Sequence, residues 1–207
     1  MVLGLCWSAA RGADEKSSLY RIEDAQAEFE RAIWPIQDAY RHGVAKALES
    51  ADRIEIYVLN FEMAKPPEPQ SLFERDTDQN DDLFPIVPCK MVSEILKRKL
   101  LNKKERGQLI TALQTMLNRN TRGSAVGCHF PIEGIRAWSG DQVVFRTSLC
   151  FHCGNYTFEY PNGSDIIQMG GNEVEEIMKQ LLPVPQSEVD RFKAKYPGTD
   201  KAKKKGE

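Results

Sequence analysis

The sequence has no hydrophobic run long enough to cross a membrane. Its longest apolar stretch covers only residues 1–10, whereas a spanning helix needs roughly 20 residues. The chain also lacks an excess of either charge, because 28 Lys and Arg residues stand against 30 Asp and Glu residues and the pI is about 6.0. Such a chain has no global field that attracts nucleic acid or an anionic membrane surface. We therefore expect no transmembrane segment and no nucleic-acid partner.

Common catalytic motifs are missing as well. The sequence contains no Gly-rich phosphate loop, no Gly-x-Ser-x-Gly elbow and no His-Glu-x-x-His pattern. Glu133 and Glu159 stand alone in predicted strands, where a surface position is the default for a carboxylate. Part of the acidic stretch 74–82 matches the first calcium ligands of an EF-hand loop, but Asp81 replaces the glycine that such a loop requires. We interpret that stretch as a solvated loop.

The sequence does contain a cluster of soft ligands around a predicted hairpin. A Ser-Gly dipeptide ending at Gly140 favours a tight turn, and residues 130–138 and 141–149 on either side have the composition of paired strands. If this dipeptide is the loop, Trp138 lies opposite Asp141. Counting back along both strands then brings five side chains together at the open end of the hairpin: Cys128, His129, Cys150, His152 and Cys153.

One chemistry that suits this cluster is a structural zinc site. A tetrahedral Cys₃His site would take three thiolates and one imidazole: Cys128, Cys150, Cys153 and His129, with His152 as the alternative nitrogen ligand. The strong pattern for zinc has two Cys-x-x-Cys pairs, and this chain has one. Zn²⁺ is the only cofactor that the sequence suggests.

The second chemistry is a disulfide bond, which depends on the compartment. Cys128 bonded to Cys150 or Cys153 would close the base of the hairpin. The remaining thiol would stay free or pair with Cys89. The third chemistry is thiol redox catalysis, which needs a low thiol pKa of the kind that a helix N-terminus supplies. Because a strand over 155–160 follows the cysteine pair, we expect a structural role instead.

The N-terminus indicates export. Residues 1–13 end in small residues ahead of a polar stretch, which is typical of the last part of a signal peptide, although no basic residue precedes the apolar run. Their removal would also remove Cys6 and leave four cysteines, an even number that suits an oxidising compartment. We expect a periplasmic or secreted protein, with the cytoplasm as the alternative.

The remaining pattern predicts a single α+β domain over residues 14–185. A chain of 207 residues with 41% hydrophobic residues can bury a real core. Helical spacing of apolar residues predicts core-facing helices at 19–33, 35–49, 103–118 and 173–182. The second of these begins at Pro35, and Asn102 and Asn172 begin capping boxes at the last two. An acidic and Pro-rich loop covers 64–82, and residues 186–207 form a charged mobile tail.

Alternating or β-branched residues predict the strands. They fall at 53–59, 83–87, 92–101, 130–138, 141–149, 155–160 and 165–169. A helix is the alternative for 92–101. We expect an antiparallel meander over about 129–170, extended by 53–59, with the helices packed on one face of the sheet.

Three short segments share a pattern with other proteins. Residues 51–59 read Ala-Asp-Arg-Ile-Glu-Ile-Tyr-Val-Leu, residues 128–136 read Cys-His-Phe-Pro-Ile-Glu-Gly-Ile-Arg, and residues 149–153 read Leu-Cys-Phe-His-Cys. They resemble a loosely defined group of small exported bacterial proteins of unknown function. The resemblance spans roughly residues 35–183 and implies the fold and export. Glu133 stands where the group has a histidine, so no role of that histidine carries over.

These observations predict an exported, non-enzymatic protein. We expect an envelope or secreted interaction module with a protein partner and a hairpin stapled by cysteines. The competing hypothesis is a zinc-dependent or thiol-active enzyme that uses Cys128, Cys150 and Cys153. The sequence indicates no oligomeric state.

Overall fold

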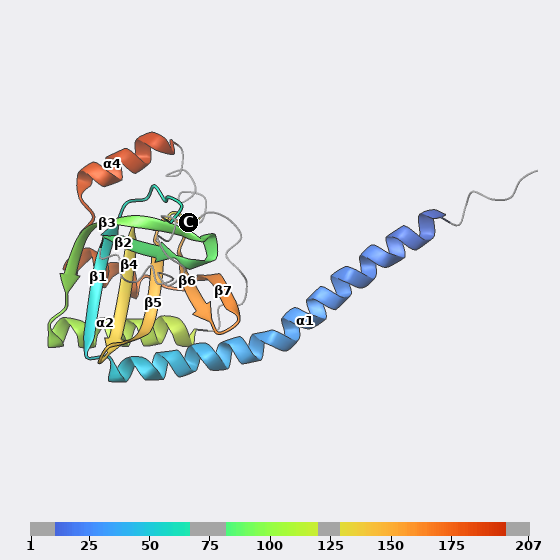
Figure 1. The fold of residues 1–207 in the computed structure, drawn as a ribbon, viewed down its shortest axis with the longest axis horizontal. Coiled ribbons are helices and arrows are strands. Elements are labelled where there is room, and N and C mark those ends of the chain that lie inside the picture. The colour runs from blue at the N-terminus through green and yellow to red at the C-terminus, as the bar shows by residue number, and fades with distance from the viewer. Residues whose placement is uncertain (1–10, 67–81, 120–128, 198–207) are drawn as a thin grey trace, which may run out of the picture. The chain divides into compact units, whose positions relative to one another are not determined.

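The computed structural model describes residues 11–66, 82–119 and 129–197. It combines helices with a seven-stranded antiparallel sheet, so the protein belongs to the α+β class as predicted (Figure 1). The chain divides into two compact units after Tyr40, which are described separately. Within the described ranges, no helix has both the length and the apolar character that crossing a bilayer requires.

The first unit consists of most of helix α1 (Arg11–Ala47). The expected break at Pro35 is absent, because the helix continues through it. A proline removes one backbone hydrogen bond from a helix, and helix-favouring residues on both sides, several of them alanines, continue the helix past it. Phe29 and Ile36 are 65% and 69% exposed, so the core-facing role predicted for them is wrong. Apolar packing against the sheet begins only near the end of the helix, at Val44 and Ala45.

The second unit is built on the sheet. Its strands are β1 (Arg53–Leu59), β2 (Leu83–Ile86), β3 (Met91–Leu100), β4 (Glu133–Ser139), β5 (Gln142–Cys150), β6 (Asn155–Tyr160) and β7 (Gly163–Gln168). They lie in the order β2-β3-β1-β4-β5-β6-β7, and each pairing is antiparallel. The meander β4 to β7 and its extension by β1 are therefore confirmed. Residues 92–101 contribute to a strand and not to a helix, apart from the last of them.

The β4–β5 hairpin has a different register from the predicted one. Its loop consists of Gly140, at φ +58°, and Asp141. The ladder also contains a bulge between Ala137 and Trp138, and Trp138 lies opposite Val143. The predicted pairing of Trp138 with Asp141 is therefore wrong. A bulge inserts one residue into one strand, and turn composition alone does not reveal it.

One face of the sheet carries the main apolar core. Helices α2 (Lys103–Asn118) and α3 (Glu173–Leu181) pack there, together with the 3-10 turn η1 (Leu48–Ser50). The capping box of α2 is confirmed, because the Asn102 side chain accepts from Lys104 N and Glu105 N at 3.0 Å. The box predicted for α3 is wrong, since the Asn172 side chain donates to Glu176 instead.

The other face carries a smaller apolar cluster. Phe84 of β2 packs on Tyr57 of β1 with ring centroids 5.3 Å apart, and Leu59 and Ile86 complete the cluster. The Phe84 ring also covers Gly134 of β4. Between β2 and β3 lies the 3-10 turn η3 (Val87–Cys89). The β2–β3 pair therefore covers the neighbouring part of the sheet.

The C-terminal segment was predicted to be a mobile tail, and for residues 186–195 this is wrong. They form helix α4 (Gln186–Lys195), drawn in red-orange in Figure 1. Phe192 and Tyr196 form a cluster of aromatic rings with Phe61 and Phe130 at centroid distances of 4.7 to 6.2 Å. Phe192 and Tyr196 are spaced by one helical turn, which indicates a helix with an apolar face. The many charged residues around them suggested a mobile tail instead.

The contact between Gly134 and Phe84 yields a prediction. A Cβ at Gly134 would lie 2.9 Å from two atoms of the fully buried Phe84 ring. We expect Gly134→Ala to lower the free energy of unfolding by about 1–3 kcal/mol, as overpacking does. Denaturant unfolding measures the change. Gly107→Ala is the matched control, because a Cβ there meets nothing within 4 Å. A Phe84→Leu background should reduce the loss, and equal losses in both backgrounds would contradict the overpacking explanation.

Candidate functional site

The predicted cysteine cluster is described only in part. Cys128 lies outside the described residues, as do Cys6 and the acidic stretch 74–81. Cys150, at the end of β5, is a fully buried free thiol, and Cys89 is an exposed free thiol in η3. Cys153 follows Cys150 in the turn after β5, and its predicted disulfide partner Cys128 is not among the described residues.

The Cys150 sulfur lies in a tight turn between β5 and β6. Its Sγ accepts a hydrogen bond from Cys153 N at 3.4 Å, and the turn closes through Gly154 at φ +65°. Burial raises the pKa of the Cys150 thiol, while backbone N–H groups of Cys153, Phe130 and His152 act in the opposite direction. Because burial is the largest effect, the thiol is a poor nucleophile at neutral pH.

His129 occupies a buried polar chain and not an open ligand position. Its Nδ1 lies 2.7 Å from Asn155 Oδ1, and its Nε2 lies 2.9 Å from Ser148 Oγ. An amide oxygen only accepts, so Nδ1 donates to Asn155 and Nε2 of the neutral ring accepts from Ser148. Burial lowers the pKa of His129. The ring is therefore held neutral with both nitrogens engaged.

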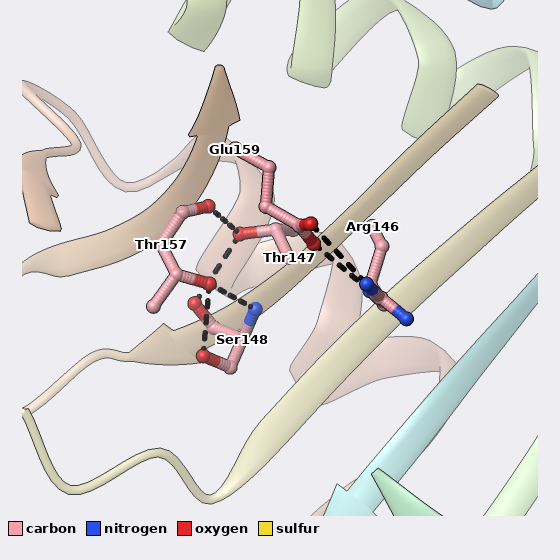
Figure 2. A network of polar contacts seen from close by, with 5 residues as sticks. All are labelled: Arg146, Thr147, Ser148, Thr157 and Glu159. Atoms are coloured by element: carbon pink, nitrogen blue, oxygen red, sulfur yellow. Dashed lines mark hydrogen bonds and ion pairs between the residues drawn. The ribbon is translucent and has the colours of Figure 1, made fainter. Parts of the chain in front are cut away.

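The buried polar network extends from His129 and Ser148 into the region where β5 and β6 lie side by side. Ser148 Oγ lies 3.0 Å from Thr157 Oγ1, and Thr157 Oγ1 accepts the Ser148 backbone N–H at 2.9 Å (Figure 2). Thr147 Oγ1 donates to the Thr157 carbonyl at 2.7 Å. All three side chains are buried. These side-chain bonds stand where backbone ladder bonds would otherwise join the two strands, since the β5–β6 pairing covers only the ends nearest the turn.

The order hydroxyl, imidazole and carbonyl oxygen in Ser148, His129 and Asn155 is that of a nucleophilic relay. The surroundings do not suit catalysis. Ser148 has no exposed surface, and an amide cannot stabilise an imidazolium as a carboxylate does. We conclude that this network of buried hydrogen bonds has a structural role and joins β5, β6 and the segment before β4. The sequence did not lead us to predict a role for Ser148 or Asn155. Two adjacent polar residues in a central strand, Thr147 and Ser148, were the signal that could have indicated buried hydrogen bonds there.

Glu133 is the second buried polar group, and the surface position predicted for it is wrong. It is 1% exposed at the start of β4, and its Oε2 has no hydrogen-bond partner among the described residues. Burial raises the pKa of Glu133 to about 8, with a further increase from the negative charge of Glu175 and a decrease from Lys179. This carboxyl group is largely protonated at neutral pH.

Arginine side chains line the sheet face opposite the main core. Arg136 is buried, with its Cζ 5.5 to 5.7 Å from the ring centroids of Tyr57, Phe84 and Trp138. Arg146 donates two hydrogen bonds to the Glu159 carboxylate, at 2.9 and 3.2 Å, as Figure 2 shows. Such bidentate pairs fix geometry, so this charged pair joins β5 to β6 beyond the end of their backbone ladder.

An apolar cavity of about 150 Å³ lies between α4 and the sheet. Its apolar walls come from β1, the segment before β4, and α4: Leu59, Phe61, Phe130, Ile132, Val189 and Phe192. Three polar residues also line it: Glu188, Lys193 and His152, whose ring centroid lies 5.8 Å from that of Phe192. The cavity thus contains one of the predicted ligand residues, whereas His129, Cys150 and Glu133 do not line it.

The described residues bring no three metal-type side chains together. Because Cys128 is outside the described residues, the zinc site of Cys128, Cys150, Cys153 and His129 or His152 stays a prediction. Cys89 lies in η3 and is exposed. What the described residues do form is a neutral, buried network of hydrogen bonds and, separately, an apolar cavity.

The buried Glu133 yields a prediction about pH. Its pKa is raised from 4.5 to about 8, so the folded state keeps a proton that the unfolded state releases above pH 4.5. The contribution of this group to stability is present below pH 4.5 and is lost as the pH rises through about 8. Gln resembles the protonated carboxyl, so Glu133→Gln should be more stable than the wild type at pH 8 by roughly 2–4 kcal/mol, with near equality at pH 4.5.

Denaturant unfolding at several pH values measures this difference. Glu159→Gln is the control, because that carboxylate is paired with Arg146 and its loss should not stabilise the protein at pH 8. An unchanged pH profile for Glu133→Gln would show that the carboxyl group is not the source of the dependence.

Comparison with known proteins finds no matching protein-family model, no similar curated protein and no similar solved structure. The resemblance to a group of exported bacterial proteins therefore stays a prediction.

Proposed function

We propose that this protein is an exported, non-enzymatic binding module whose ligand is a small apolar molecule held between α4 and the sheet. The observation that carries the proposal is the apolar cavity of about 150 Å³. A cavity of this size lined by apolar side chains accepts a single aromatic ring. Ligand pockets are mostly apolar with few polar groups, and here the polar lining consists of His152, Glu188 and Lys193.

The attachment of α4 supports the proposal. Arg191 donates to Asn60 Oδ1 at 2.6 Å, and Lys195 donates to Glu62 Oε1 at 2.7 Å. Both bonds involve exposed groups, which contribute little to stability. Aromatic rings supply the rest of the contact, through Phe61 and Phe192 at 5.2 Å. A short helix held in this way can shift to admit a ligand without disturbing the main core on α2.

The buried groups favour binding over catalysis. A catalytic group has to reach a substrate, and Ser148, His129 and Glu133 are buried away from the cavity. The Cys150 thiol has a raised pKa, which argues against the thiol-active alternative. We propose a disulfide between Cys153 and Cys128, which would suit an oxidising compartment.

A second candidate is a structural zinc site, which one observation favours. The Cys150 sulfur receives a backbone N–H from Cys153 at 3.4 Å, and hydrogen bonds to a thiolate are the kind of outer contact that supports a metal ligand. In a reducing compartment, Cys128, Cys150 and Cys153 would bind zinc with His152, because both ring nitrogens of His129 already have hydrogen-bond partners. Compartment and redox state thus separate the two candidates.

The cavity yields the first prediction. Toluene and indole should each bind the wild-type protein saturably and shift the methyl resonances of Leu59, Ile132 and Val189. Val189→Trp should abolish binding, because an indole would fill the cavity. Ala194→Trp is the matched control on the exposed side of α4 and should bind as the wild type does. The proposal would be wrong if Val189→Trp still bound toluene or indole, or if the wild-type protein bound neither.

The cysteines yield the second prediction. An intact mass measured without reductant should be lower by two hydrogens in the wild type and in Cys150→Ser. Cys153→Ser should lose this deficit and also about 2–5 kcal/mol of unfolding free energy, as removal of a native disulfide does. A mass higher by one zinc ion, with the thiols intact, would favour the second candidate instead.

A further inference from the structure

Helix α1 presents an apolar stripe to solvent. Phe29 is 65% exposed, Ile36 is 69% exposed and Tyr40 is 41% exposed, while Ile33 between them is half-buried. Large apolar side chains exposed in a row are unusual on a soluble helix and mark an interaction surface. The stripe belongs to the first compact unit and is separate from the cavity beside α4.

The spacing of the stripe identifies the kind of surface that fits it. Residues 29, 33, 36 and 40 follow one another at intervals of four, three and four. This is the heptad repeat, in which positions a and d alternate and each side chain fits between four residues of a second helix. The printed sequence continues the intervals upstream with Leu19, Ile22 and Gln26. A partner that matches this repeat is another helix with the same period.

The flanks of the stripe suit a second copy of α1. Ala32 and Ala39 lie on one side of the stripe, at position g, and their small side chains allow close approach. Glu30 and Gln37 lie on the other side, at position e. Of the four flanking residues at positions e and g, only Glu30 is charged. Pro35 lies at position c, away from the seam, where its ring does not meet a partner helix. No run of like charges therefore opposes pairing of two identical helices.

The exposed area of the stripe is that of a small interface. A large apolar side chain buries roughly 200 Å², so the exposed parts of Phe29, Ile36 and Tyr40 amount to about 330 Å² per copy. Two copies would bury about 650 Å² through these three residues, which is the scale of a weak and reversible association. Without a partner, α1 would leave the apolar area of this stripe exposed to water.

We propose that the protein self-associates through α1, with the stripe of Phe29, Ile33, Ile36 and Tyr40 docked on the same stripe of a second copy in a coiled coil. This interaction is independent of the cavity and goes beyond the proposed binding function. It would bring two copies of the protein into one assembly. Two copies held together would bind a ligand array with greater avidity than one.

Sedimentation equilibrium of the full chain tests the proposal. We expect a mass near twice 23.5 kDa for the wild type. The double variant Phe29→Glu with Ile36→Glu should sediment as a single chain, with its dissociation constant raised at least 100-fold, because it places charges in the seam. A wild type that stays a single chain up to 100 µM would overturn the proposal.

The matched control is the double variant Ala27→Glu with Trp34→Glu. It adds the same charge on the same helix and removes a large apolar side chain, but both positions lie outside the seam. It should keep the mass of two chains, and dissociation of both double variants alike would also overturn the proposal. Toluene binding and the unfolding midpoint of the sheet domain should be unchanged in all of these proteins. These readouts distinguish a failed coiled coil from a failed fold or a failed ligand site.

Discussion

The alternation of side chains along β4 and β5 is the constraint on which the rest of the structure depends. Successive residues of a strand face opposite sides, so Ile135 and Ala137 enter the core against α2 while Gly134 and Arg136 face Phe84. The same rule makes Leu149 a core residue and turns Ser148 toward His129. A slip of one residue would exchange these two environments completely. The bulge after Ala137 changes this register by one residue, so the side chains that pack on either face of the sheet have to fit the altered register.

The buried titratable groups respond to pH in opposite directions. Burial lowers the pKa of His129, so its contribution to stability is present above pH 6.5 and is lost as the pH falls. Burial raises the pKa of Glu133, so its contribution is lost as the pH rises. Both groups are neutral in the folded state near neutrality. The interior thus tolerates polar side chains because it keeps them uncharged and, for His129, fully hydrogen-bonded.

Local signals predicted more of the fold than of the site. The α+β class, the meander and the capping box at Asn102 follow from periodicity and short-range contacts, and the structure confirms them. The burial of Glu133 and the partners of His129 depend on which strands become neighbours. No local pattern reports that, and charge alone placed Glu133 on the surface. The cavity also escaped prediction, because it requires α4, whose charged residues suggested a tail.

Helices α1 and α4 show that one sequence signal has two structural outcomes. Each carries apolar residues at helical spacing among many charges. In α4 the stripe is short, and Phe192 finds the rings of Phe61 and Phe130 within its own domain. In α1 the stripe keeps heptad intervals over residues 29–40, yet Phe29 and Ile36 remain exposed. This contrast is the reason that we propose a second copy of α1 as the partner of the stripe.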